Sequence, residues 1–314
     1  MLKINKPKFW DNKIGLFSII FFPLSVVFIL LIFIKKKFTK IKRFKIPIIC
    51  VGNIYIGGTG KTPTSILLAN ELSKLGKKPV ILRKFYKNHN DEYNLIKKSF
   101  KNLIITKNRI EGLKEAEKSN FNIVIFDDGL QDYKIKKNIK IVCFNRNQLI
   151  GNGLVLPSGP LRESLSSLKD VEIVIINGSK DENFEKKILK INKKLEIFYS
   201  SYTPINLHQF KNKKLFALAA IGNPTNFFQL IEQNGLKIEK KLIFPDHYVF
   251  SKSEIENIVN EAESKNYKII MTEKDYFKVN RYNLENINYL KVSLEITEKK
   301  KLLDKINSLY DQNN

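Results

Sequence analysis

The longest apolar run of the chain lies near its N-terminus, where residues 14–34 contain no charged side chain. As a helix this run would be about 32 Å long at roughly 1.5 Å per residue, enough to cross a hydrocarbon core of about 30 Å. A cleaved signal peptide would have a shorter apolar region and a small-residue cleavage site. Here residues 35–45 follow, with seven basic residues in eleven. We therefore predict a transmembrane or membrane-embedded helix over 14–34, with the downstream chain on the cytoplasmic side. Pro23 keeps a re-entrant or interfacial hairpin open as an alternative.

Beyond the basic run, apolar segments typical of buried strands alternate with amphipathic segments typical of helices. Helical patterns occupy residues 62–75 and 108–119. The strand-like runs lie at residues 47–52, 78–83, 103–106, 122–128, 139–145 and 171–177. Alternation of this kind predicts an α/β fold, a parallel sheet with helices on both faces.

The pattern breaks around residues 200–213 and then restarts. Strand-like and helix-like segments alternate again from residue 214 to a terminal helix. We therefore predict a larger domain over residues 46–203 and a second, smaller α/β lobe over residues 204–314. Within the larger domain, residues 146–170 are rich in Gly, Pro and Ser, and we expect a long functional loop there.

The charge of the chain indicates what kind of partner it binds, and its cysteine content indicates the cellular compartment. The chain has 55 Lys and Arg against 31 Asp and Glu, a net charge of +24. This favours an anionic partner, although a Lys-rich genome accounts for it equally well. Since the basic run directly follows an apolar run that is long enough for a membrane helix, an anionic membrane surface is favoured and nucleic acid is not expected. Cys50 and Cys143 lie in separate apolar runs without metal-binding spacing, which fits a reducing cytoplasm.

The segment GGTGKT, residues 57–62, lies between the first predicted strand and the first predicted helix, as a phosphate-binding loop requires. Its glycines let backbone N–H groups face phosphate oxygens at the helix N-terminus. We expect Lys61 to reach the β- and γ-phosphates of ATP and the hydroxyl of Thr62 to bind Mg²⁺. The predicted nucleotide-binding residues are Tyr55, Ile56, Gly57, Gly58, Thr59, Gly60, Lys61 and Thr62.

Neighbouring residues restrict the class of P-loop protein. The strict pattern has Gly where this chain has Tyr55. ATPases that partition DNA or division proteins have Lys where this chain has Ile56. The segment TEKD, residues 272–275, lacks the Asn of the NKxD turn with which GTPases read guanine. A P-loop NTPase-like kinase is therefore favoured over these classes.

Carboxylates follow the strand-like run at residues 122–128. Asp127 and Asp128 end this run, and a carboxylate at such a strand end faces the phosphate loop and holds Mg²⁺. The alternative is that the pair caps the next turn. In the long loop, Arg162 could bind a phosphate group through its guanidinium, with Glu163 beside it, or the two could form a surface ion pair.

Several segments together resemble the tetraacyldisaccharide 4′-kinases of lipid A synthesis. The resemblance spans nearly the whole chain and includes the N-terminal membrane helix. The matching motifs are VGNIYIGGTGKTP (51–63), DDGLQ (127–131), GNGLVLPSGPLRE (151–163), IGNP (221–224), FPDHY (244–248) and MTEKD (271–275). Two positions depart from the family pattern: Asp132 replaces a usual His, and LRKFY (82–86) keeps Arg83 but lacks two glycines. The departures leave the phosphate-binding residues unchanged.

The resemblance implies two α/β/α lobes with the active site between them. It implies transfer of the γ-phosphate of ATP, with Mg²⁺, to the 4′-hydroxyl of a tetraacylated glucosamine disaccharide 1-phosphate. The catalytic residues implied are Lys61 and an Asp–His pair that matches Asp91 and His247. Because these two residues fall in the two different predicted domains, the pair is expected to come from opposite lobes.

The implied location is the cytoplasmic face of the inner membrane of a Gram-negative bacterium, where the lipid A disaccharide precursor would be the partner. A membrane-associated P-loop ATPase that acts as a switch or in transport is the alternative. Such a protein should carry partner-binding or dimerisation elements, and none is evident in the sequence. A zinc enzyme is not expected, since the three histidines lack metal-binding spacing.

Overall fold

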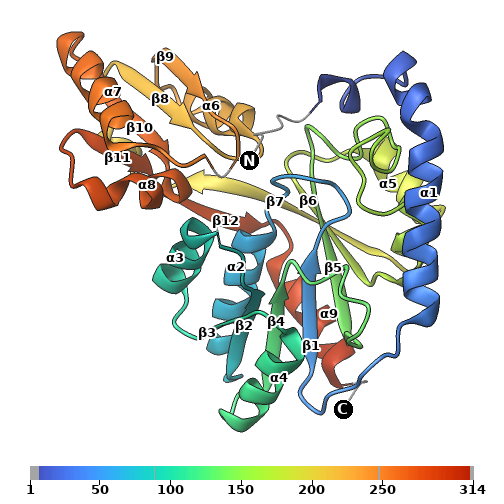
Figure 1. The fold of residues 1–314 in the computed structure, drawn as a ribbon. Coiled ribbons are helices and arrows are strands. Elements are labelled where there is room, and N and C mark those ends of the chain that lie inside the picture. Colours follow the sequence, from blue (N-terminus) through green and yellow to red (C-terminus); the bar gives the residue numbers. More distant parts are fainter. Residues whose placement is uncertain (1–6, 88, 247, 312–314) are drawn as a thin grey trace. The chain divides into compact units, whose positions relative to one another are not determined.

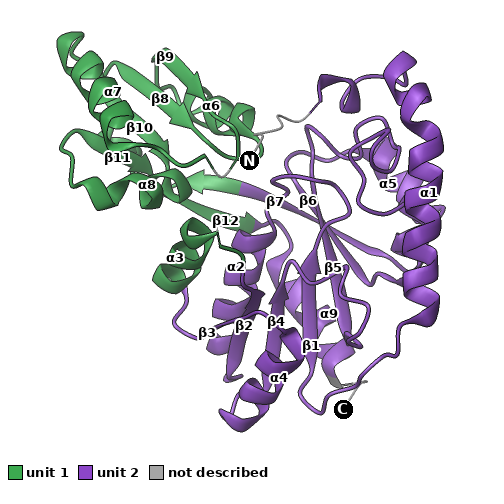
Figure 2. Ribbon diagram, in the orientation of Figure 1, with its two compact units in different colours: residues 1–5, 86–99, 202–295 green, residues 6–85, 100–201, 296–314 purple. Residues whose placement is uncertain are grey.

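The computed structural model describes residues 7–87, 89–246 and 248–311. The described chain forms two compact units (Figure 2). Unit 1 comprises residues 86–99 and 202–295, and unit 2 comprises residues up to 85, residues 100–201 and residues from 296 onward. The described part of the chain, from residue 7 to residue 311, therefore passes between the units four times.

The centre of unit 2 is an eight-stranded sheet (Figure 1), in which residues 202–204 and 292–295 of two strands are assigned to unit 1. Its strands are β1 (Ile48–Gly52), β2 (Pro79–Lys84), β3 (Leu103–Thr106), β4 (Ile123–Asp127), β5 (Ile139–Asn145), β6 (Ile173–Asn177), β7 (Glu196–Pro204) and β12 (Val292–Ile296). The strand order is β12-β7-β6-β5-β1-β4-β2-β3, and the strands from β3 to β7 pair in parallel. Strands β1, β4 and β6 are buried along their whole length, which explains their unbroken apolar sequences.

Helices cover both faces of this sheet. They are α1 (Leu16–Phe38), α2 (Lys61–Lys74), α4 (Arg109–Lys118), α5 (Glu182–Leu189) and α9 (Lys299–Asp311), with short 3₁₀ segments at Lys8–Trp10 and Leu165–Asp170. Alternate residues of β1, Ile48 and Cys50, pack in one cluster with Leu113 of α4 and Ile188 of α5. Helix α2 packs against β1, β2 and β4, and α9 packs against β5.

Unit 1 contains a four-stranded parallel sheet in the order β11-β10-β8-β9. Its strands are β8 (Leu215–Ala219), β9 (Ile238–Ile243), β10 (Lys268–Thr272) and β11 (Ile287–Leu290); its helices are α3 (Asn90–Ser99), α6 (Pro224–Gln233), α7 (Lys252–Ser264) and α8 (Glu273–Val279), with 3₁₀ segments at Leu207–Gln209 and Asn280–Tyr282. Phe216 of β8 packs with Ile255 of α7, whereas the next residue, Ala217, packs with Ile231 of α6. Helices α6 and α7 thus cover opposite faces.

The predicted fold class is confirmed: a mainly parallel α/β protein with a second, smaller α/β unit and an apolar N-terminal helix. The unit boundaries differ from the predicted domains at two places. Residues 86–99 belong to unit 1, and the terminal helix α9 belongs to unit 2. Tyr93 and Ile96 of α3 are buried, and α3 packs against α8, about 180 residues later in the chain. Pairing over that separation leaves no local pattern in a sequence.

Candidate active site

The phosphate loop joins β1 to α2 within unit 2. Gly57 has φ +125° and Gly60 has φ +91°, and both values favour glycine. Helix α2 begins at Lys61, directly after Gly60, so the first N–H groups of the helix are available to a phosphate. The loop has the conformation and position that nucleotide phosphates require.

Tyr55 and Ile56 form the base of this loop. The Tyr55 ring is fully buried, and its hydroxyl donates a hydrogen bond to Asp11 Oδ1 at 2.8 Å. The Ile56 N–H donates to the carbonyl of Pro160 at 2.9 Å. Of the predicted nucleotide-binding residues, 57–62 therefore remain as those that can face phosphate. The buried ring and the hydrogen bond to Asp11 also show how a tyrosine is accommodated where other phosphate loops have glycine.

The side chain of Asn53 holds the phosphate loop in place through hydrogen bonds. No role for this residue was predicted from the sequence. Its side chain is fully buried, and Nδ2 donates to the Gly57 carbonyl at 3.2 Å and to Thr59 Oγ1 at 3.1 Å. Gln131 in turn donates to the Asn53 carbonyl at 3.0 Å. In the sequence, only their positions inside the motifs at residues 51–63 and 127–131 point to a role for Asn53 and Gln131.

Asp127 lies at the end of β4, beside the start of α2. Thr62 Oγ1 donates to Asp127 Oδ2 at 3.0 Å, and Ser65 Oγ donates to Oδ1 at 3.2 Å. Arg83, its register partner on β2, donates to the same Oδ2 and to Thr62 Oγ1 at 3.1 Å. Arg83 is 4% exposed and Asp127 is fully buried. Removing one partner of such a pair costs about 3–5 kcal/mol, so Arg83 and Asp127 also hold the fold together.

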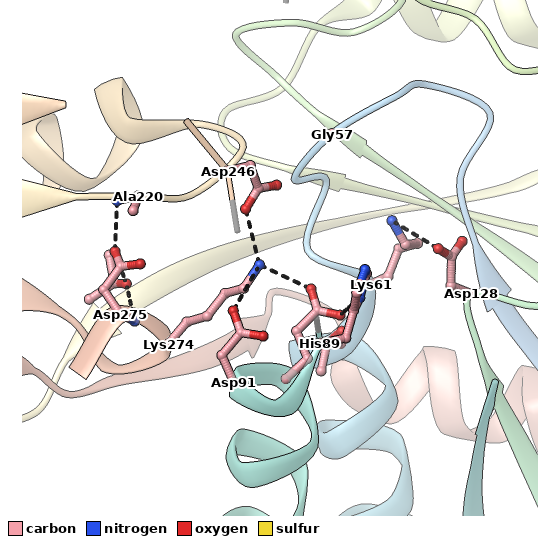
Figure 3. Close-up of polar contacts among 12 residues, drawn as sticks. Gly57, Lys61, His89, Asp91, Asp128, Ala220, Asp246, Lys274 and Asp275 are labelled. Atoms are coloured by element: carbon pink, nitrogen blue, oxygen red, sulfur yellow. Dashed lines mark hydrogen bonds and ion pairs between the residues drawn. The ribbon is translucent and has the colours of Figure 1, made fainter. Parts of the chain in front are cut away.

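Asp128 faces the opposite charges of the site. Its carboxylate lies 3.1 Å from the Arg162 guanidinium. It also lies 3.9 Å from Lys61 Nζ (Figure 3). Burial acts to raise the pKa of Asp128, but Lys61, Arg162, Arg83 and Arg109 outweigh it and lower the pKa to about 2. Burial also lowers the pKa of Lys61, against the attraction of Asp128. Asp128 is therefore ionised at neutral pH and can serve as an oxygen ligand.

The donor atoms near the loop suit Mg²⁺, which prefers hard oxygen ligands. Thr62 and Asp127 already lie within hydrogen-bond distance of each other, and Asp128 is ionised. Among the described residues, no group of three or more His, Cys, Asp or Glu is arranged to hold a metal. A magnesium ion bound here would take most of its ligands from phosphates and water.

Glu163 and Arg162 are adjacent, but their side chains have different partners. Whereas Arg162 contacts Asp128, Glu163 accepts from Lys36 Nζ at 2.5 Å and from Gln131 Nε2 at 3.1 Å. Glu163 is only 3% exposed. Near the end of the long loop, Arg162 therefore contacts the phosphate site and Glu163 contacts helix α1. Asp132, the departure noted above, lies 3.4 Å from Arg109.

Helix α1 is bonded to the same loop along most of its length. Ser25 Oγ, 2% exposed, donates to the Val155 carbonyl at 2.8 Å and lies 2.8 Å from Ser158 Oγ. Asn152 Nδ2 donates to Ser18 Oγ at 3.1 Å. Together with the Lys36–Glu163 pair, these contacts form one polar stripe on an otherwise apolar helix. The exposed apolar side chains of α1 include Leu16, Phe17, Ile19, Ile20, Leu24, Val27, Leu30, Leu31 and Phe33.

Asp91 lies in unit 1, which corrects the expectation that it belongs to the phosphate-loop domain. It stands in the first turn of α3, 5% exposed, with Oδ2 at 3.7 Å from both Lys274 Nζ and Lys278 Nζ of α8. His247 lies outside the described residues. Its neighbour Asp246 accepts from Lys274 at 3.2 Å (Figure 3). Asp91 and Asp246 therefore belong to the same unit.

Strand, phosphate loop, helix and acidic strand end together define a P-loop nucleotide-binding protein of the kinase type. A family model described as tetraacyldisaccharide-1-P 4′-kinase matches residues 17–311. The tetraacyldisaccharide 4′-kinase of Pelagibacter ubique (strain HTCC1062) is 42% identical over 319 residues, covering 99% of this chain and all of that protein. The tetraacyldisaccharide 4′-kinase of Francisella tularensis subsp. novicida (strain U112) is 33% identical, covering 92% of this chain and 98% of that protein.

Among solved structures, LpxK from Aquifex aeolicus, described as an "apo" form in complex with ATP, superposes with a TM-score of 0.71. It is 22% identical in sequence and covers 94% of this chain and 99% of its own, which shows a shared fold. The chain belongs to the tetraacyldisaccharide-1-phosphate 4′-kinase family, and it is therefore an ATP-dependent kinase.

Proposed function

We propose that the chain transfers the γ-phosphate of ATP to the 4′-hydroxyl of a tetraacylated glucosamine disaccharide 1-phosphate, a step of lipid A biosynthesis. The observation that carries the proposal is the complete phosphate site, with Lys61, Asp128 and Arg162 in contact, in a chain 42% identical to a tetraacyldisaccharide 4′-kinase. The acceptor is the one that the names of the relatives state.

On the donor side, the chain binds and orients the triphosphate. Residues 57–62 and the start of α2 offer N–H groups to phosphate oxygens, and Lys61 places its ammonium on the β- and γ-phosphates. Thr62 and Asp127, with Asp128, would hold Mg²⁺, which when bound neutralises charge on the phosphates. Arg162, released from Asp128, can bind the transferring phosphoryl group through its guanidinium. Glu163 binds Lys36 of α1 and so holds the long loop beside Arg162 in place.

On the acceptor side, Asp91 accepts the proton of the 4′-hydroxyl as the phosphoryl group moves, with His247 as its partner. Because phosphoryl transfer has a loose transition state, positioning carries most of the catalysis and the base adds a smaller part. Asp91 is buried, with its carboxylate 3.7 Å from the ammonium groups of Lys274 and Lys278. A positioned carboxylate can act as the general base for a hydroxyl proton.

Helix α1 would place the enzyme on the cytoplasmic face of the inner membrane, where its lipid acceptor lies. Its contacts with the long loop of the same unit run from Ser18 to Lys36, about 27 Å along the helix at roughly 1.5 Å per residue. A helix that crossed the bilayer would carry Asn152, Ser158 and Glu163 through the hydrocarbon with it. We therefore infer that α1 is embedded on its side, with its apolar faces in lipid and its polar stripe on the protein.

This embedded placement predicts on which side of the membrane the N-terminal segment lies. A cysteine introduced as Lys8→Cys should resist a membrane-impermeant maleimide in spheroplasts and react only after permeabilisation. A spanning helix gives the opposite result, because residue 8 then faces the periplasm. Lys193→Cys, an exposed position of unit 2, is the matched control for the cytoplasmic side.

The native cysteines do not disturb this measurement. Cys50 and Cys143 are buried, and burial raises the pKa of Cys50 to about 11 and that of Cys143 to about 12. Thiols that stay protonated and covered do not react with maleimide at neutral pH. Labelling of Lys8→Cys in intact spheroplasts would therefore disprove the embedded placement.

The reaction itself is tested by transfer of radiolabelled γ-phosphate to a purified acceptor. We expect label in the lipid when the disaccharide carries a free 4′-hydroxyl, and none when that hydroxyl is already phosphorylated. Acceptor-independent release of inorganic phosphate at a comparable rate, without labelled lipid, would contradict the proposal and favour the ATPase alternative.

A further inference from the structure

Lys274 of α8 joins two segments of unit 1 that are far apart in the sequence. Its Nζ lies 3.1 Å from Glu92 Oε1, 3.7 Å from Asp91 Oδ2 and 3.2 Å from Asp246 Oδ1 (Figure 3). The first two carboxylates, Glu92 and Asp91, are on α3, and the third is in the segment between β9 and α7. The Lys274 side chain is only 15% exposed.

The position of Lys274 is fixed by the first turn of α8. Thr272 caps this helix by accepting from the Asp275 N–H at 3.1 Å, and Asp275 accepts from the Ala220 N–H at 2.9 Å. Lys278, one turn further on, donates to Asp275 at 2.7 Å and to the Ala220 carbonyl at 2.8 Å. The beginning of α8 is therefore bonded to the end of β8, and Lys274 projects from a rigid element.

The charges around Lys274 make its ammonium necessary for this arrangement. Asp91, Glu92 and Asp246 all lie within 3.7 Å of its nitrogen. Without the cation, three carboxylates would face one another in a partly buried space, where like charges repel strongly. Lys278 also lies 3.7 Å from Asp91 Oδ2, but its hydrogen bonds go to Asp275 and Ala220, so it does not link Asp91 to Glu92 and Asp246 as Lys274 does.

We propose that Lys274 is a positioning residue that holds the carboxylates of Asp91 and Asp246 together for proton acceptance by Asp91 from the acceptor hydroxyl. The inference rests on the proposed function. Its consequence is that Asp91 on α3 is linked to Asp246 through a lysine of α8 to which the motif MTEKD gave no separate role.

Lys274→Met is the direct test, with turnover measured by label transfer to the lipid acceptor. We expect kcat to fall about 10²-fold, the effect of a displacement of about 1 Å at a reacting group. The KM for ATP should change less than about twofold, since the phosphate-loop residues belong to unit 2. Lys240→Met is the control, because Lys240 also pairs with a carboxylate of unit 1, at 2.5 Å from Glu261, outside this cluster.

A pH profile separates positioning from a general loss of structure. Removing a cation next to a carboxylate favours its protonated form, so the acid limb of kcat should move to higher pH by about 1 unit in Lys274→Met. Lys274→Arg keeps the charge, so its acid limb should stay in place. The described charged and titratable groups around Asp91 are His89, Glu92, Asp246, Lys274, Asp275 and Lys278.

The outcomes distinguish this inference from the proposed function. If the wild-type enzyme does not label the acceptor, the proposed function has failed. If the wild type labels it, and Lys274→Met has an unmoved acid limb and a kcat like that of Lys240→Met, the positioning role is overturned. If Lys274→Met does not fold, Lys274→Arg is the deciding variant. The planar guanidinium of arginine cannot contact the same three carboxylates as the compact ammonium of lysine does, so kcat should fall at least about fivefold. Wild-type kcat in that variant overturns the role.

Discussion

Lys61→Ala is expected to lower kcat/KM for label transfer by about 10³-fold or more, while the protein remains folded. Lys61 is 13% exposed and lies at the start of α2, where it contacts Asp128. Its ammonium provides a fixed positive charge for the β- and γ-phosphates, and losing one such stabilising group costs about 10²–10³ in rate before weaker nucleotide binding is counted. Transfer kinetics and nucleotide binding, both measured on the purified enzyme, check the two contributions.

Lys74→Ala is the matched control for this prediction. Lys74 is on the same helix, but its side chain is 69% exposed and pairs with Glu71 at 2.8 Å. Exposed pairs contribute little, so activity and melting temperature should stay near those of the wild type. If Lys61→Ala retained near-normal turnover, the phosphate loop would have no part in the reaction. Asp127 variants are less informative, because the buried pair with Arg83 couples this carboxylate to stability.

The phosphate site could be predicted from the sequence because its determinants are local. The β1–loop–α2 segment is continuous, and Asp127 and Asp128 end a neighbouring apolar run. In a parallel sheet, the carboxyl ends of adjacent strands meet at one edge, so the sequence alone brings these groups together. Arg83 was identified as a retained motif residue, but its pairing with Asp127 depends on strand order, which the pattern does not contain.

The acceptor side could not be predicted in the same way. Asp91 precedes most of unit 2 in the sequence, yet α3 packs on α8 of unit 1. Lys274 meets Asp91 across more than 180 residues, and no periodicity encodes that contact. The polar stripe of α1 is a similar case. Ser18 and Ser25 are minor interruptions of an apolar run, and only their partners in the long loop show that this face is turned to the protein.

Asp91→Asn is expected to lower kcat by about 10²–10⁴-fold, the usual range for loss of a general base. The amide keeps the size of the side chain but cannot accept the hydroxyl proton. The KM for ATP should change little, because the described nucleotide-site residues all belong to unit 2 and Asp91 belongs to unit 1. Glu261→Gln, which neutralises a carboxylate of unit 1 that is paired with Lys240, is the control and should leave kcat unchanged.

His247→Ala completes this test, because the proposed role belongs to a pair. Residues that act as a unit lose their effect together, so the double variant Asp91→Asn, His247→Ala should be no slower than the slower single variant. Rate losses that multiply would show that the two residues act independently, and an unchanged rate in His247→Ala alone would leave Asp91 to act without it. Since Asp91 and Asp246, next to His247, are bound to one lysine within unit 1, the pairing requires no encounter between the two units. If the rate losses of Asp91→Asn and His247→Ala become multiplicative when both are measured in Lys274→Met, the pair depends on the positioning role of that lysine.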